Sequence, residues 1–157
     1  MKKLAALAAG FVVAMSGHAA EPWDHDANIE KAVGDFERAY FAAGIPGVAE
    51  AVTGCYAEFE KAPEAQKLES CVAMDYAGFI FDVAAAKKEQ GQNRETPVAN
   101  FQTRFFLPQA NEARTKGGFA KLGVAEADSR AMLDQIFSVT YKRMVARGTP
   151  SPRQPRR

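Results

Sequence analysis

The stretch 69-ESCVAMDYAGFIFDVAAAKK-88 decides the expected fold of the chain. Successive residues of an α-helix are roughly 100° apart around its axis, and on that spacing apolar side chains fall on almost every side of this segment. Asp75 and Asp82 share one edge with Cys71, and the opposite side is entirely apolar. A helix without a polar face belongs in the middle of a bundle, covered by its neighbours. We therefore predict that a helix over residues 63–90 is the central helix of the fold.

Four other segments show helical periodicity, and none shows the sustained alternation of a strand. We expect these helices at residues 24–44, 46–62, 98–117 and 125–147. Gly44 can end the first, Pro46 suits the first turn of the second, and Pro108 is expected to break or bend the third of them. In the last helix the side chains expected to point inward are Leu133, Ile136, Phe137, Tyr141 and Met144. The prediction is an all-α fold, a single small bundle of about five helices over residues 21–147.

Cys55 and Cys71 are the only cysteines of the chain, and each lies eight residues from Pro63. An antiparallel hairpin that turns at Pro63 would bring the two sulfurs to the same height. In an oxidising compartment such a pair normally forms a bridge. We predict a disulfide-linked helical hairpin, worth about 3 kcal/mol for a loop of this length. A free catalytic thiol is the alternative.

Residues 1–20, MKKLAALAAGFVVAMSGHAA, have the organisation of a secretory signal peptide. Two lysines precede an apolar run from Leu4 to Met15, and small residues follow. The run is shorter than the roughly 20 residues that a membrane-spanning helix needs. We expect cleavage after Ala19 or Ala20, a mature chain without a transmembrane segment, and a periplasmic or secreted location. An uncleaved anchor is the alternative.

Charge is nearly balanced overall, with 20 basic and 19 acidic residues, but it is unevenly placed. Residues 142–157 contain six basic residues and no acidic one, which leaves residues 21–141 acidic. The segment 148-GTPSPRQPRR-157 is rich in proline and arginine, and we expect a disordered basic tail. It lacks the interleaved aromatic residues of a single-strand binder, so a nucleic acid is not an expected partner.

The chain contains no catalytic motif that we can identify. His25 is the only histidine left after the expected cleavage, and with Asp24 and Asp26 it is expected to cap a helix rather than to bind a metal. No serine stands in a GxSxG pattern, and no glycines form a GxGxxG or GxxxxGK pattern. We expect no catalytic residue, no metal and no cofactor.

Asp75 and Asp82 are the predicted buried polar residues. An unpaired buried carboxylate is unfavourable, so it keeps its proton or finds a donor. The donors expected for Asp75 are Arg104, Arg130, Arg143 and the hydroxyls of Tyr76 and Tyr141. A structural role for both carboxylates is preferred over catalysis, because ion-pair networks also produce such buried acids.

The segment 100-NFQTRFFLP-108 is the most suggestive surface candidate. Phe101 and Phe105 share one stripe of the expected helix, whereas Phe106 points elsewhere. Core packing on a neighbouring helix is the preferred prediction for Phe106. If Phe106 and Leu107 are exposed instead, they form an apolar anchor for a partner. We take Phe106 and Leu107 as the interaction candidates.

These observations favour a non-catalytic, exported binding protein: an inhibitor, an immunity factor or an accessory of an envelope complex. The expected partner is another envelope protein. The alternative function is an acid-protective periplasmic chaperone, whose bundle would loosen below about pH 4 when its acidic body and Asp75 are protonated. A hydrolase that uses Asp75 or Asp82 is less favoured, as is a noncovalent carrier of haem or of another small ligand.

Overall fold

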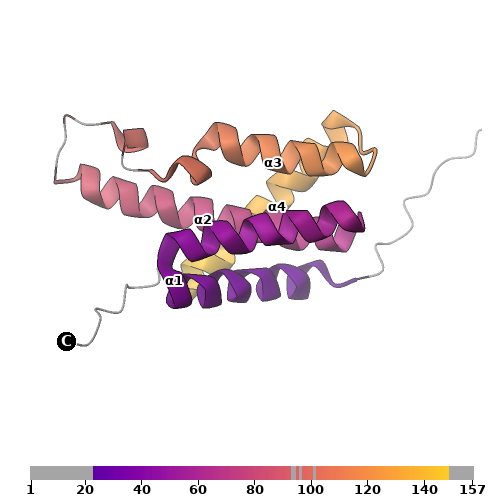
Figure 1. The fold of residues 1–157 in the computed structure, drawn as a ribbon, viewed down its shortest axis with the longest axis horizontal. Helices are drawn as coiled ribbons and strands as arrows, with labels where there is room; N and C mark the ends of the chain where they lie inside the picture. Colours follow the sequence, from indigo (N-terminus) through magenta and orange to yellow (C-terminus); the bar gives the residue numbers. More distant parts are fainter. Residues whose placement is uncertain (1–22, 93–94, 96, 101, 149–157) are drawn as a thin grey trace, which may run out of the picture.

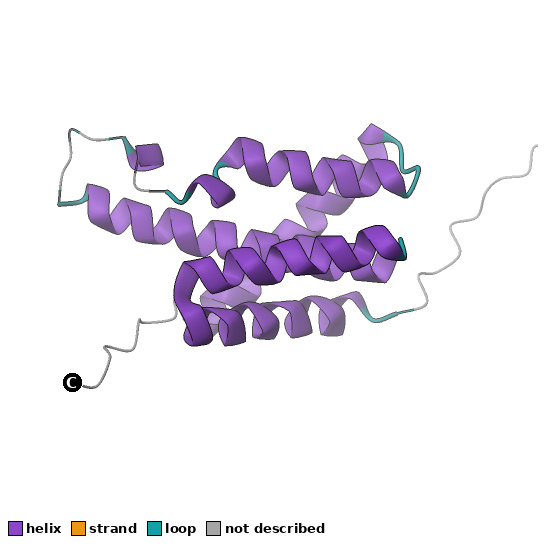
Figure 2. Cartoon of the chain, viewed as in Figure 1, coloured by secondary structure: helices purple, strands orange, loops and turns teal. Residues whose placement is uncertain are grey.

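The computed structural model describes residues 23–92, 95, 97–100 and 102–148. This part of the chain is an all-helical bundle with no strand, as the sequence predicts (Figures 1 and 2). Its elements are α1 His25–Lys61, α2 Ala65–Gln90, the short 3-10 helices η1 Val98–Asn100 and η2 Arg104–Phe106, α3 Pro108–Lys121 and α4 Glu126–Arg147. None of these helices is apolar over a stretch long enough to cross a membrane. The predicted signal peptide and residues 149–157 of the predicted tail lie outside the described residues.

Helix α1 consists of two arms that meet at a sharp turn, and Figure 1 shows them running in opposite directions. The turn falls at Ala43 and Gly44, whose backbone angles are not helical, and Gly44 has a φ of 65° that favours glycine. Pro46 then begins the second arm, where its missing N–H removes no helical bond. The structure therefore has four α-helices instead of about five, because the two helices predicted at 24–44 and 46–62 are the arms of one element.

The central position predicted for the helix over residues 63–90 is confirmed by α2. It contacts every other helical element of the described chain, and Figure 1 shows it in the middle of the bundle. Its fully buried apolar side chains are Leu68, Cys71, Val72, Ala73 and Ala77. Both arms of α1 contribute to the same core, through Phe36 on the first arm and Phe59 on the second. The absence of a polar face on α2 is thus explained by neighbours on all sides.

The fourth predicted helix, 98–117, differs most from the structure. Its first part forms η1 and η2, and Pro108 begins α3 instead of breaking a helix. Proline is common at the first position of a helix, where its nitrogen needs no partner. The connection lies tightly on α2 because Gly78 leaves room for Phe106: a Cβ atom at position 78 would lie 2.5 Å from the ring.

Candidate functional site

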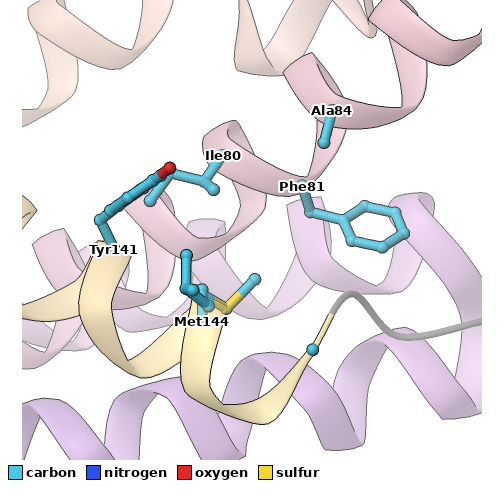
Figure 3. A pocket seen from close by; sticks show the side chains of 7 residues that line it. Ile80, Phe81, Ala84, Tyr141 and Met144 are labelled. Carbon is cyan, nitrogen blue, oxygen red and sulfur yellow. The ribbon is translucent and has the colours of Figure 1, made fainter.

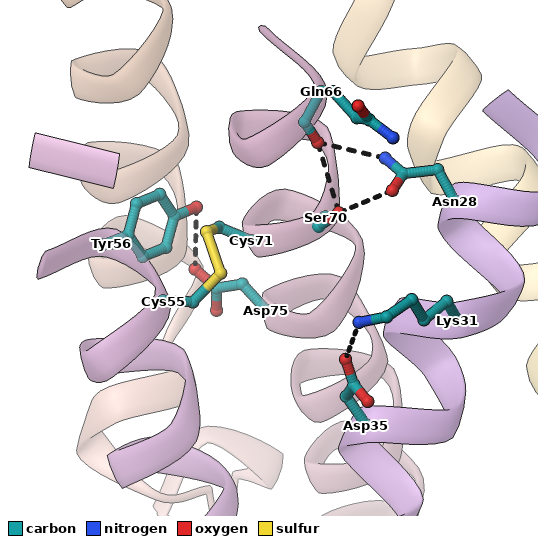
Figure 4. Close-up of a disulfide and its surroundings, with 9 residues drawn as sticks. All are labelled: Asn28, Lys31, Asp35, Cys55, Tyr56, Gln66, Ser70, Cys71 and Asp75. Carbon is teal, nitrogen blue, oxygen red and sulfur yellow. Dashed lines mark hydrogen bonds and ion pairs between the residues drawn. A yellow bond between two sulfur atoms is a disulfide. The ribbon is translucent and has the colours of Figure 1, made fainter. Parts of the chain in front are cut away.

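The disulfide between Cys55 and Cys71 confirms the predicted hairpin. It joins the second arm of α1 to α2, with the two Cα atoms 5.5 Å apart, and Figure 4 shows it beside Asp75. The turn at Ala62, Pro63 and Glu64 sets the two helices antiparallel, so residues equally distant from Pro63 face each other. Among the described residues no cysteine is free, which removes the alternative of a catalytic thiol.

Asp75 is fully buried and holds an ion pair with Arg114 of α3. Nε of Arg114 donates to Oδ2 and Nη2 donates to Oδ1, both at 2.8 Å. The Tyr56 hydroxyl adds a longer hydrogen bond of 3.5 Å to Oδ2 (Figure 4), and the Arg114 guanidinium stands 3.9 Å over the ring of Phe105. These contacts join α1, α2 and α3 around one carboxylate.

Burial is the main cause of the pKa shifts of Asp75 and of the two tyrosines near it, Tyr56 and Tyr76. It raises the pKa of Asp75 above its usual value, although the hydrogen bonds and the charge of Arg114 act in the opposite direction. Burial, together with the nearby charge of Asp75, also raises the pKa of Tyr76 to about 12. The pKa of Tyr56 is raised well above its ordinary value for the same two reasons. Both phenols therefore stay protonated at neutral pH, and the hydroxyl of Tyr56 donates to Asp75.

Asp82 is also buried, but its partner is neutral. Its carboxylate accepts the backbone N–H of Thr103 at 2.9 Å and the Thr103 hydroxyl at 2.8 Å. Thr103 is the residue that precedes η2. Asp82 therefore fixes the start of the connection to α3.

The predictions for Arg104, Phe106 and Leu107 have different outcomes. Arg104 is exposed and donates to neither aspartate. The donor to Asp75 is Arg114, which lies within the helix predicted at 98–117 but was not among the expected donors. Phe106 is fully buried in the core, because η2 turns it onto Gly78. Core packing, the preferred of its two predicted positions, is therefore confirmed, and Phe106 cannot be a surface anchor. Leu107 is half-buried and accepts the first backbone hydrogen bonds of α3 from Ala110 and Asn111.

A second polar cluster, which sequence reasoning missed, surrounds the buried carboxylate of Glu69. Trp23 Nε1 donates to it at 2.9 Å, Asn28 Nδ2 donates at 2.6 Å, and Nδ1 of His25 is in contact with its other oxygen. The Ser70 hydroxyl donates to Oδ1 of Asn28, as Figure 4 shows, and extends the cluster by one residue. The cluster fastens the start of α1 to α2. Within the described chain, no three His, Cys, Asp or Glu side chains are grouped to hold a metal ion.

An apolar groove of about 270 Å³ lies between α2 and α4 (Figure 3). It is lined by Ile80, Phe81 and Ala84 from α2, by Tyr141, Met144 and Val145 from α4, and by Gly148. Beside it, Phe137, Tyr141 and Val145 form a stripe along α4 with exposed fractions of 38%, 50% and 61%. Phe137 and Tyr141 were predicted to point inward. They do not, because the inward face of α4 is instead formed by Ser129, Leu133, Ile136, Thr140 and Met144.

One end of this groove is basic. Lys87 and Lys88 follow Ala84 by one turn of α2 and continue the same wall of the groove. Both are exposed, and neither forms an ion pair with a described residue. On α4, Lys142 is exposed and has no ion-pair partner among the described residues. Arg143 and Arg147 add no free charge, because they are paired with acidic residues of α1, namely Asp26, Glu30 and Glu37. The groove thus combines an apolar floor with positive charge at one end.

Comparisons of the chain with protein-family models, with curated proteins and with solved structures find no match.

Proposed function

We propose that the protein is an exported, non-catalytic binding protein that engages an envelope protein through the groove between α2 and α4. The observation that carries this proposal is the exposed stripe of Phe137, Tyr141 and Val145 beside an apolar groove. Contiguous exposed apolar side chains on a small protein typically mark an interaction site. The Cys55–Cys71 disulfide is compatible with the oxidising compartment that export implies.

The occupant that fits this groove is an amphipathic helix with acidic residues at one end. A groove between two helices accepts the apolar face of a third helix, with side chains spaced three or four residues apart as anchors. Lys87, Lys88 and Lys142 provide positive charge without an ion-pair partner in the described structure. Acidic side chains on the incoming helix would complement that charge and set its orientation.

The state of the buried acids supports a role without catalysis. Both oxygens of Asp75 and both oxygens of Asp82 accept hydrogen bonds from within the protein. Neither carboxylate lines the groove. A hydrolase that uses either of them would need an open carboxylate beside a substrate, with a second catalytic group in reach.

The test is affinity capture from an envelope extract with the mature protein, compared between two double variants of α4. Tyr141→Ala with Val145→Ala removes the stripe, and we expect the captured helical protein to be lost. Gln135→Ala with Ser138→Ala is the matched control, because it changes two exposed residues of the same helix that do not line the groove. Equal capture by both double variants would contradict the proposal.

The charge of the groove is tested separately. Lys88→Glu should weaken binding of the captured partner at least tenfold, and more strongly at low salt, whereas Lys67→Glu at the other end of α2 should leave it unchanged. Sedimentation of the free protein over a range of concentrations provides the alternative outcome. Self-association that disappears with Tyr141→Ala and Val145→Ala would identify a second copy of the chain, not another protein, as the occupant.

A further inference from the structure

The bend between the two arms of α1 forms an apolar tip at one end of the bundle. Residues 39-AYFAAGIPGVA-49, which we call the elbow, contain no charged residue and a single polar side-chain group, the hydroxyl of Tyr40. Figure 1 shows the elbow at the same end of the bundle as the last turns of α2 and α4. We propose that the elbow docks on the surface of a lipid bilayer that contains anionic phospholipids, with Phe41 inserted at the level of the headgroups.

The elbow exposes apolar side chains to solvent. Phe41 is 56% exposed, the largest fraction of any phenylalanine in the described core or on its surface, and Ala42, Ala43 and Pro46 are exposed as well. The chain reverses its direction at Ala43 and Gly44, so these side chains lie on the convex side of a bend. A convex tip with an aromatic ring and small apolar residues fits the interfacial region of a bilayer, where aromatic rings are favoured.

The core beneath the elbow is complete without Phe41. Phe36 is fully buried, and the rings of Tyr40 and Phe81 pack on each other with their centroids 4.5 Å apart. Phe41 touches only the outer side of this group among the ring contacts of the described chain, at 5.9 Å from the ring of Tyr40. Its ring is therefore held at the surface on a rigid support and can enter a bilayer without unfolding the bundle.

The charge near the elbow complements an anionic surface. Lys87 and Lys88 are exposed on the last turns of α2, and neither forms an ion pair with a described residue. By sequence, residues 87–95 and 148–157 together contain six basic and two acidic residues, and Glu50 after the elbow adds one more acid. Basic residues close to a membrane are attracted by anionic headgroups, and this attraction weakens as salt is added.

The charged residues that precede the elbow do not oppose this attraction. They form ion pairs within the protein, namely Asp35 with Arg38 and Glu37 with Arg147. The net charge available at this end of the bundle is therefore positive.

This proposal goes beyond the proposed function and does not rest on it. No residue of the elbow lines the groove between α2 and α4. A bilayer and a helical protein partner could therefore be bound through different side chains, and a variant of each surface distinguishes them.

The test is cosedimentation of the mature protein with two sets of sucrose-loaded vesicles. One set contains phosphatidylcholine and phosphatidylglycerol in equal amounts, and the other contains phosphatidylcholine alone. We expect the protein to bind the mixed vesicles at least tenfold more tightly than the neutral ones, and less tightly as salt is added. Equal binding to both sets, or no binding to the mixed vesicles at low salt, would overturn the proposal.

Two matched variants locate the contact. Phe41→Ser should weaken binding to the mixed vesicles at least tenfold, whereas Tyr141→Ser, which changes an exposed aromatic residue of the groove, should leave it unchanged. Lys87→Gln combined with Lys88→Gln should weaken binding at least tenfold at low salt. Equal effects of Phe41→Ser and Tyr141→Ser would contradict a contact through the elbow.

A third variant reports insertion directly and keeps the aromatic ring. Phe41→Trp should bind the mixed vesicles as tightly as the wild type, and its fluorescence should shift to the blue when they are added. The wild type, which shares Trp23, is the control for this signal. The absence of a blue shift would overturn the proposal, as would self-association without vesicles that Phe41→Ser abolishes, because a second copy of the chain would then cover the elbow.

Discussion

Asp75 and Asp82 stand seven residues apart on the same helix, and both are buried, yet the protein satisfies them in different ways. Asp75, the deeper of the two, has a bidentate arginine that is itself covered by the ring of Phe105. Asp82 has one neutral threonine. The comparison shows that the fully buried Asp75 is paired with a positive charge, whereas Asp82, close to a loop, accepts hydrogen bonds from neutral donors of that loop.

The surroundings of Asp75 and of Asp82 differ accordingly in which elements they connect. Around Asp75 the ion pair and the disulfide hold α1, α2 and α3 together. Around Asp82 a single residue fixes one connection. Removing one partner of a buried ion pair is expensive, because it leaves a charge uncompensated, whereas a neutral hydrogen bond contributes about 1 kcal/mol. Substitutions around Asp75 and around Asp82 should therefore differ in how much they lower the free energy of unfolding. The pH dependence of that loss should differ as well.

The largest expected effect is that of Arg114→Ala. It leaves the fully buried Asp75 without its cation, so we expect a loss of about 3 to 5 kcal/mol in the free energy of unfolding at neutral pH. Urea denaturation measures this loss. Arg104→Ala is the matched control, since Arg104 is exposed, and it should change the free energy by less than about 0.5 kcal/mol. An equal effect of both substitutions would contradict the comparison.

The loss in Arg114→Ala should also depend on pH, with a sign that follows from burial. Burial raises the pKa of Asp75, so the folded protein binds this proton more tightly than the unfolded chain does. The resulting stabilisation is present below the unfolded pKa and is lost as the pH rises through the folded pKa. Without Arg114 the pKa should rise further, and the variant should therefore be more stable at pH 5 than at pH 8.

This sign bears on the predicted alternative of an acid-protective chaperone. That function requires protonation of the acidic body together with Asp75 to loosen the bundle, whereas the raised pKa of Asp75 makes its own protonation favour the folded state. Glu30 behaves in the opposite way, because its hydrogen bond with Arg147 lowers its pKa and its contribution is lost as the pH falls. If a dye for apolar surface binds only in acid, Asp75→Asn should leave that transition where it is. A shift of the transition in this variant would support the chaperone.

The second expected effect is removal of the disulfide. Replacing Cys55 and Cys71 by alanine should lower the free energy of unfolding by about 3 kcal/mol, since the bridge closes a loop with a sequence separation of 16. Guanidinium denaturation compares the variant with the oxidised protein. Combining the change with Arg114→Ala should cost less than the sum if the two links hold the same end of α2. Strict additivity would show that they act independently.

The smallest expected effect is that of Thr103→Ala. It removes one of the two hydrogen bonds to Asp82 and leaves the backbone donor in place, so the free energy of unfolding should fall by about 1 kcal/mol. Thr53→Ala is a matched control on the surface of α1, where the higher helix propensity of alanine should stabilise slightly, by up to about 0.7 kcal/mol. If Thr103→Ala lowered the free energy of unfolding by more than about 3 kcal/mol, the contacts of Asp82 would be as important for stability as the ion pair of Asp75, and the comparison would fail.

The spacing of residues along the sequence was sufficient to predict the hairpin formed by the second arm of α1 and α2. The disulfide followed from two cysteines equally distant from Pro63, and the central position of α2 followed from its missing polar face. The burial of Asp75 was predicted as well. All three depend on a single hairpin, whose geometry is fixed by short-range sequence.

The positions of η2, α3 and α4 depend on contacts between segments that are far apart in the sequence, and helical spacing does not predict such contacts. Phe106 lies in a 3-10 turn, so angles counted on an α-helix could not decide between core packing, which the structure has, and an exposed position. Tyr141 was expected inside because it is apolar, but the smaller Thr140 takes the inward position on α4. Arg114 was not among the expected donors to Asp75, because only the packing of α3 on α2 brings the two side chains together.

The notch at Gly78 has a consequence for the assembly of these parts. Phe106 seats on Gly78, α3 begins two residues later, and Arg114 then reaches Asp75, which lies three residues before the glycine. Gly78 thus sets the position of α3 along α2. A larger residue at position 78 would displace Phe106 and α3, and it would weaken the ion pair between Arg114 and Asp75 without contacting it. The variant would then resemble a charge substitution although no charge had changed.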